Sequence, residues 1–203
     1  MSDSLFDQRW IFLDIESDGP RPGDHSMLSC ALVEMRIYPD GVEEIANYYA
    51  RIQPLSGAKQ DKATMTWWKT QPDAWAEARR GPFETPEGWA QRAHHFVSTG
   101  ETAPTIVSDL AAFDGAWLNY YFSRARVISS PINVIDTRSF MMGSWGLPKH
   151  KCGKNRWPKS WFPGDVVHDH NALNDARTLG RTFARAIQTC RGERPDFSKA
   201  SNA

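Results

Sequence analysis

The sequence predicts one α/β domain with a mixed β-sheet of about five strands flanked by helices. Three observations support this fold class. The chain opens with three strand-like segments, helical and strand patterns alternate along the remainder, and no internal repeat or flexible linker divides the chain. We therefore expect a single domain over residues 1–190, followed by a frayed polar tail over 191–203, which lacks periodicity.

The strands are predicted from apolar runs and turn signals. The run WIFLDI at residues 10–15 is continuously apolar until it reaches an acid, which suits a strand buried on both faces. Residues 27–38 and 43–53 also have strand character, and the turn signal Pro39-Asp40-Gly41 between them predicts a hairpin. Two further short strands are expected over residues 104–108 and 133–136.

The helices are predicted from apolar periodicity and capping residues. One helix is expected over residues 66–79, after the candidate cap Thr66. Another is expected over residues 86–97 after Thr85, because proline and glutamate suit its first turn. The last two helices are expected over residues 114–124 and 171–190.

Composition excludes several classes of protein. The 203 residues contain 24 Lys and Arg against 24 Asp and Glu, so the chain does not coat nucleic acid by bulk electrostatics. A nuclease remains open, because carboxylates that hold divalent metals lower the net charge. The absence of any run of about 18 apolar residues argues against a membrane span. Three cysteines are too few and too widely spaced for a disulfide framework, and no signal peptide is evident, so we expect a reducing cytoplasm.

The first predicted strand ends in two acids. Asp14 and Glu16 are two residues apart, and the period of two in a strand places both carboxylates on one face, about 6 to 7 Å apart along the backbone. Burying two uncompensated charges at the end of an apolar strand is costly, so a metal ion is a suitable partner. On its own the pair is also consistent with a strand that simply leaves the core.

A second acidic position lies where the fourth strand gives way to a helix. Asp114 falls near the start of that helix, where an acid also stabilises the helix dipole by about 0.5 to 1 kcal/mol. Asp109, five residues earlier at the end of the strand, is a rival that the sequence does not exclude.

The third acidic position is Asp175, on the last predicted helix. An apolar stripe packs this helix against the sheet; it consists of Ala172, Ala176, Gly180, Phe183 and Ile187. His170 lies five residues before Asp175, which is not a same-face spacing, so we expect it in the loop or first turn, free to approach a site. Counting in the same way from His168 reaches Leu173 and fails.

Taken together and in this order, these elements resemble the DEDDh subgroup of the DnaQ-like 3′-to-5′ exonucleases, whose fold is RNase H-like. The match consists of Asp14-x-Glu16, of Phe113-Asp114 at a helix start, and of His170 with four residues before Asp175. It spans residues 10–190. Within the superfamily the chain is most similar to small stand-alone bacterial and phage exonucleases.

The resemblance implies a site with two divalent cations, Mg²⁺ or Mn²⁺. Asp14 would bridge the two ions, Glu16 and Asp175 would complete the site of the attacking water, and Asp114 would support the second ion. His170, whose side chain has an unperturbed pKa of about 6.5, would accept the proton of that water. The implied product is a 5′-mononucleotide.

The implied substrate is a single-stranded nucleic acid with a free 3′ end, and the sequence does not decide between DNA and RNA. Two alternatives stay open: an oligoribonuclease-like enzyme for very short RNA, and an RNase H-like module that binds nucleic acid with little turnover. No membrane partner is expected. A homodimer is compatible with the resemblance, although the sequence contains no heptad seam.

Substrate contacts are predicted in a basic, aromatic segment and in a tryptophan pair. Residues 149–162 contain five Lys and Arg and no acid, interleaved with aromatic side chains. This pattern suits a single-strand channel, and equally a solvated loop whose tryptophans anchor it to the core. In the predicted 66–79 helix, adjacent tryptophans point about 100° apart, so one can face a terminal base while at least one packs in the core. The candidate substrate-binding residues are Trp67, Trp68, Lys154, Arg156 and Trp157.

An alternative reading assigns His170 to a zinc site. His150 and Cys152 form H-x-C, and His168 and His170 form H-x-H, and these ligand types suit Zn²⁺. Such a site would remove His170 from the role of base.

Overall fold

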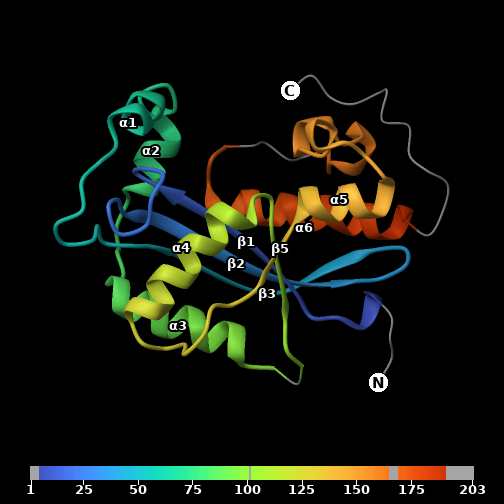
Figure 1. Ribbon diagram of the computed structural model, residues 1–203, viewed down its shortest axis with the longest axis horizontal. Coiled ribbons are helices and arrows are strands. Elements are labelled where there is room, and N and C mark those ends of the chain that lie inside the picture. The colour runs from blue at the N-terminus through green and yellow to red at the C-terminus, as the bar shows by residue number, and fades with distance from the viewer. Residues whose placement is uncertain (1–4, 101, 165–168, 191–203) are drawn as a thin grey trace.

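The structure, a computed structural model, describes residues 5–100, 102–164 and 169–190. Its centre is a five-stranded sheet with the order β3-β2-β1-β4-β5 (Figure 1). The strands are β1 (Trp10–Ser17), β2 (Met27–Ile37), β3 (Val42–Arg51), β4 (Thr105–Ser108) and β5 (Val134–Asp136). Strand β1 pairs antiparallel with β2 and parallel with β4, so the sheet is mixed, as the sequence predicts. The expected tail, residues 191–203, lies outside the described residues.

Helices cover both faces of the sheet. They are α1 (Lys62–Trp68), α2 (Pro72–Ala78), α3 (Pro86–Ser98), α4 (Ala111–Arg124), α5 (Thr137–Trp145) and α6 (Ala172–Thr189). Helix α6 packs along β1 and β2 on one face, α3 and α4 lie on the other, and α1 with α2 stands at one end of the sheet (Figure 1). Among the described residues, no helix is both long and apolar enough to cross a membrane.

Alternation along β1 divides the interior into two cores. Trp10 and Phe12 face α6, where both rings meet Phe183 edge-on with ring centroids 5.5 and 5.8 Å apart. Ile11 and Leu13 point the other way, into the core beneath α3 and α4. Because side chains alternate in a strand, residues 14 and 16 continue the row that faces α6.

The predicted helix over residues 66–79 is wrong, because two short helices occupy this region. Helix α1 begins earlier, at an N-cap formed by Asp61, whose carboxylate accepts from the Thr64 amide at 2.8 Å. The chain then leaves the helical conformation at Gln71 (φ −127°, ψ 60°). Pro72 explains the break, since proline disfavours a helical residue before it and has no N–H to donate.

The structure also contains a helix that the sequence reasoning missed. Helix α5 begins directly after β5, at the N-cap Asp136, whose carboxylate accepts from the Ser139 amide at 2.8 Å. It ends at Gly146, which adopts the left-handed conformation (φ 61°). The segment is short and contains Gly143, so its helical signal is weak. Elsewhere α3 follows the Thr85 cap as predicted, and α4 begins at Ala111, three residues before the expected start.

The close approach of α6 to the sheet depends on Gly180. A Cβ atom at this position would lie 2.5 Å from the Met35 sulfur and 2.7 Å from a ring carbon of Phe12. We expect Gly180→Val to lower the free energy of unfolding by about 2 to 3 kcal/mol, because overpacking displaces the helix. Urea denaturation at neutral pH measures the change.

Gly143→Ala is the matched control. It lies in helix α5 with no atom within 4 Å of the added Cβ, so it should raise stability by about 0.5 to 1 kcal/mol. Equal stability of the two variants would show that α6 does not depend on this close contact.

Candidate active site

Four acids from three elements lie near the ends of β1 and β4. Asp14 and Glu16 occupy the last part of β1, on the face that α6 covers. Asp175 lies in the first turn of α6, and Asp114 lies in the first turn of α4. Both helices thus present an N-terminal turn, which favours negative charge, to the same edge of the sheet.

Three of the predicted site residues meet directly. The side chains of Glu16, His170 and Asp175 each place a carboxylate oxygen or ring nitrogen within 4.8 Å of the other two. Atoms at these separations can share one cation. Residues from a strand, a loop and a helix are therefore brought together as the spacing along the sequence predicts.

Burial makes this cluster electrostatically costly. Glu16, Asp114 and Asp175 are only 9%, 7% and 2% exposed, and Asp14 is half-buried. Carboxylates removed from water require compensation by opposite charge or hydrogen bonds. The site therefore favours binding of a cation.

The four carboxylates act on one another through their charges. Burial raises the pKa of Asp14 well above its ordinary value, and the neighbouring charges of Asp114, Glu16 and Asp175 raise it further. Burial likewise raises the pKa of Glu16, and Asp175 and Asp114 add to that effect. The ammonium group of Lys154 opposes the shift in the pKa of both residues.

Asp114, rather than Asp109, belongs to the cluster. Asp109 is engaged elsewhere: it accepts from the Thr137 hydroxyl at 3.0 Å and pairs with Arg138 at 3.3 Å. Burial raises the pKa of Asp114 to about 7, the nearby Ser108 hydroxyl opposes this shift, and the charge of Asp109 adds to it.

His170 reaches the acids from an unusual backbone conformation. Its φ of 53° lies in the left-handed region, which costs a residue other than glycine about 1 to 2 kcal/mol. The next residue, Asn171, caps α6 by accepting from the amides of Leu173 and Asn174. The cap fixes the start of the helix, and His170 turns toward Glu16 and Asp175 just before it.

The tryptophan pair of α1 divides between site and core. Trp67 is 40% exposed, and its ring meets the His170 ring edge-on, with centroids 4.8 Å apart. It lines a pocket of about 260 Å³ together with Glu16 and Phe113. Trp68 is buried and donates its indole N–H to the Ser17 carbonyl at 2.9 Å. Trp68 therefore belongs to the core, and Trp67 borders the site.

The tryptophans of the basic segment anchor it to the core. Trp157 is completely buried and donates its indole N–H to the Cys152 carbonyl at 2.8 Å. Trp161 is 6% exposed and meets Trp157 edge-on. The prediction that Trp157 stacks on bases is thus not supported, because its ring is enclosed by protein. Lys154 is half-buried and Arg156 exposed, so their charges remain accessible.

The zinc alternative finds no support among the described residues. Cys152 is fully buried and its thiol donates to the Pro148 carbonyl at 3.4 Å, whereas His150 is exposed. His168 lies outside the described residues. In the described ranges His170 clusters with Glu16 and Asp175, not with the other two members of the set.

The chain matches a known domain family over most of its length. Residues 9–187 match the family described as the 3′-5′ exoribonuclease Rv2179c-like domain. The chain belongs to this family. It is accordingly a 3′-to-5′ exonuclease, and the resemblance to the DnaQ-like superfamily seen in the sequence is confirmed. No curated protein matches the chain.

Solved structures share the fold of this Rv2179c-like exonuclease. The nuclease domain of 3′hExo, a DEDDh family member bound to rAMP, is 14% identical with a TM-score of 0.67, covering 92% of this chain and 94% of that chain. E. coli exonuclease I in complex with dA16 is 15% identical with a TM-score of 0.62, covering 92% of this chain and 41% of that chain. These likenesses confirm the predicted RNase H-like sheet flanked by helices.

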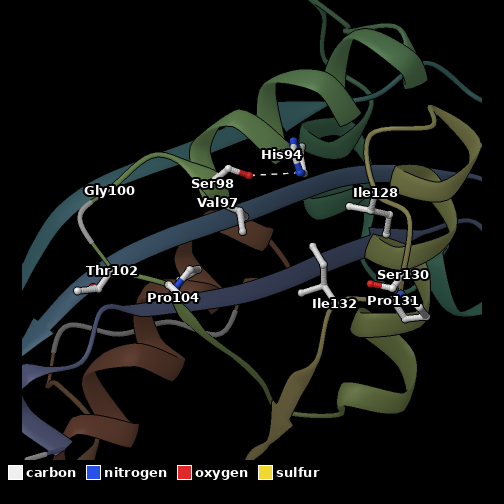
Figure 2. Close-up of a pocket in the computed structure, with 11 residues that line it drawn as sticks. His94, Val97, Ser98, Gly100, Thr102, Pro104, Ile128, Ser130, Pro131 and Ile132 are labelled. Carbon is white, nitrogen blue, oxygen red and sulfur yellow. Dashed lines mark hydrogen bonds between the residues drawn. The ribbon is translucent and has the colours of Figure 1, made fainter.

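A larger cavity of the Rv2179c-like domain lies away from the acids. It measures about 440 Å³ and lies where β4 begins, whereas the acids lie where β4 ends. Figure 2 shows His94 and Ser98 of α3 at this cavity, joined by a hydrogen bond of 3.2 Å. None of the described residues that line it carries a carboxylate, so it does not provide the hard oxygen ligands of a magnesium site.

Sequence reasoning gave no site role to Phe113 and Ser108. Phe113 lines the pocket beside Trp67, and Ser108 lies close to Asp114 at the end of β4. Phe113 could have been found, since it directly precedes Asp114 in the second motif. The position of Ser108 follows from the register of β4, which the sequence does not specify.

The raised pKa of Asp114 predicts how the stability of the metal-free exonuclease depends on pH. Its pKa is about 7 in the folded protein and about 3.9 in an unfolded chain, so the folded state binds the proton more tightly. The resulting stabilisation is complete below pH 4 and is lost as the pH rises toward 7. We expect Asp114→Asn to remove part of this dependence and to stabilise the metal-free protein at pH 8 by about 1 to 3 kcal/mol.

Urea denaturation with EDTA between pH 5 and 8 measures this effect. Asp24→Asn serves as the control, because Asp24 is exposed and pairs with Arg21 away from the cluster. Identical pH dependence in the Asp114 variant and the unmodified protein would show that Asp114 does not take up the proton.

Proposed function

We propose that the protein removes nucleotides one at a time from the 3′ end of single-stranded RNA and releases 5′-mononucleotides, within a single domain of residues 1–190. The observation that carries this proposal is the convergence of Glu16, His170 and Asp175 within 4.8 Å. Asp14 and Asp114 complete the catalytic set, since their charges act on the same cluster.

The donor set fits divalent metal ions. Carboxylate oxygens are the ligands that Mg²⁺ and Mn²⁺ prefer, and the buried acids lack a full complement of positive charge. Asp14 would contact two ions, with Glu16 and Asp175 holding one and Asp114 supporting the other. When bound, two such ions lower the pKa of the attacking water and neutralise the leaving 3′ oxygen.

His170 is proposed as the general base. An imidazole with an unperturbed pKa of about 6.5 can accept a proton at neutral pH. Contact with the Trp67 ring and the adjoining Asn171 cap restrict where His170 can lie, and its ring faces the acids. A base held in place by its surroundings need not be reoriented during each turnover.

The proposed substrate contacts combine stacking with positive charge. Trp67 is the exposed aromatic residue beside the 260 Å³ pocket, and Phe113 lines the same pocket, so a terminal base can stack there. Lys154 and Arg156 supply charge for the phosphate backbone. The family description names an exoribonuclease, which favours RNA over DNA.

A cleavage assay tests this function. Oligomers of RNA and DNA with equal sequence and a 5′ label are incubated with Mg²⁺, Mn²⁺ or EDTA. We expect a metal-dependent ladder that shortens from the 3′ end, faster on RNA. A faster DNA ladder would correct the substrate, activity confined to dinucleotides would indicate an oligoribonuclease-like enzyme, and absence of shortening would contradict the function.

Two substitutions separate the proposed roles. Asp14→Asn should reduce cleavage at least about a thousandfold, because it removes a ligand shared by both ions. His170→Ala should reduce the rate by about 10² to 10⁴ while Mn²⁺ binding persists, because proton transfer contributes that much. Single-turnover rates and calorimetric Mn²⁺ titrations measure the two effects. Asp40→Asn, in the exposed β2–β3 turn, is the control. Unchanged turnover in Asp14→Asn would contradict the metal assignment.

A further inference from the structure

Lys154 is held near the acid cluster by a braced loop. It begins a short 3₁₀ turn, Lys154–Arg156, and the turn is followed by Trp157. Trp157 is completely buried, is hydrogen-bonded back to Cys152 and packs against Trp161. The backbone on both sides of Lys154 is therefore fixed to the core, and only its flexible side chain is free to adjust.

The charge of Lys154 reaches three of the four carboxylates. It lowers the pKa of Asp14, of Glu16 and of Asp114, in each case against the effect of burial. Its effect on residues from both β1 and α4 places the ammonium group beside the cluster as a whole. The half-buried side chain keeps part of this charge out of bulk water, which limits screening by salt.

Lys154 nevertheless makes no direct pair. Within the described part of the chain, no hydrogen bond or ion pair fixes its ammonium group. Nearby cations behave differently: Arg138 pairs with Asp109 at 3.3 Å, and Arg177 pairs with Glu44 at 2.8 Å. A lysine in direct contact with the acids would occupy positions that metal ions need. Lys154 instead acts on the acids without filling their site.

A cation in this position has opposite effects on the two species that the site must bind. It repels a divalent ion at the acids, because like charges raise the free energy of binding. It attracts a phosphate placed between itself and that ion. A phosphate therefore removes the repulsion that the metal experiences, and by linkage the metal improves phosphate binding by the same factor.

We propose that Lys154 is a positioning residue that couples metal binding to substrate binding: it weakens the hold on divalent ions until a nucleotide phosphate occupies the gap between its ammonium group and the acids. This inference rests on the proposed function, in which these acids hold the metal. In the metal-free enzyme the same charge partly neutralises the acid cluster.

Calorimetric titration with Mn²⁺, with and without saturating 5′-AMP, tests the coupling without any turnover. Lys154→Gln should bind Mn²⁺ alone roughly three- to tenfold more tightly than the unmodified protein, because a like charge is removed. The factor by which 5′-AMP tightens Mn²⁺ binding should fall by a similar ratio. Lys154→Arg should keep both values close to those of the unmodified protein, since the charge is retained.

Lys159→Gln is the matched control, because it removes an exposed lysine from the same loop and should leave both values unchanged. Unchanged or weaker Mn²⁺ binding in Lys154→Gln would overturn the inference. An undiminished 5′-AMP effect in that variant would also overturn it.

Asp14→Asn distinguishes this failure from failure of the proposed function. If Asp14→Asn loses Mn²⁺ binding while Lys154→Gln behaves like the unmodified protein, the acids hold the metal and only the coupling role is wrong. If Asp14→Asn binds Mn²⁺ normally, the metal assignment itself fails.

Discussion

Repulsion among buried carboxylates at the end of β1 is the constraint on which the rest of the structure depends. The apolar strand carries Asp14 and Glu16 into the interior, where their charges are poorly solvated. Two helices relieve part of this cost, because Asp114 and Asp175 each lie in an N-terminal turn with a favourable dipole. The remaining imbalance is what makes the site a receptor for cations, and the fold keeps that imbalance by packing α6 tightly against the sheet.

The acids of β1 and α6 were predictable because their placement follows from periodicity. Alternation along β1 sends Asp14 and Glu16 to the side that Phe12 occupies, and the apolar stripe of α6 turns Asp175 toward the same side. The choice of Asp114 over Asp109 was not decided by this reasoning. It depends on the partners of Asp109, one of which, Arg138, lies in a helix that the sequence did not reveal.

Features that depend on tertiary contacts were beyond the sequence. The split between α1 and α2 was signalled by Pro72, but the stronger apolar pattern across it favoured one helix. Two adjacent tryptophans gave no indication of which one would be buried, since that depends on the Ser17 carbonyl reaching Trp68. The burial of Trp157 likewise depends on packing among the 3₁₀ turns, for which composition offers no guide.

Helices α1 and α2 have a small core of their own, formed by Leu28, Trp68, Ala74 and Ala78, apart from the two cores that hold the sheet. The surface that Trp67 offers to a terminal base therefore belongs to a unit that can change in length or sequence with little effect on the packing beneath the acids. In the proposed enzyme, the choice of 3′ end and the hydrolysis of the phosphodiester bond are separable properties. Evolution or engineering can alter the first through this helical pair while the second is retained.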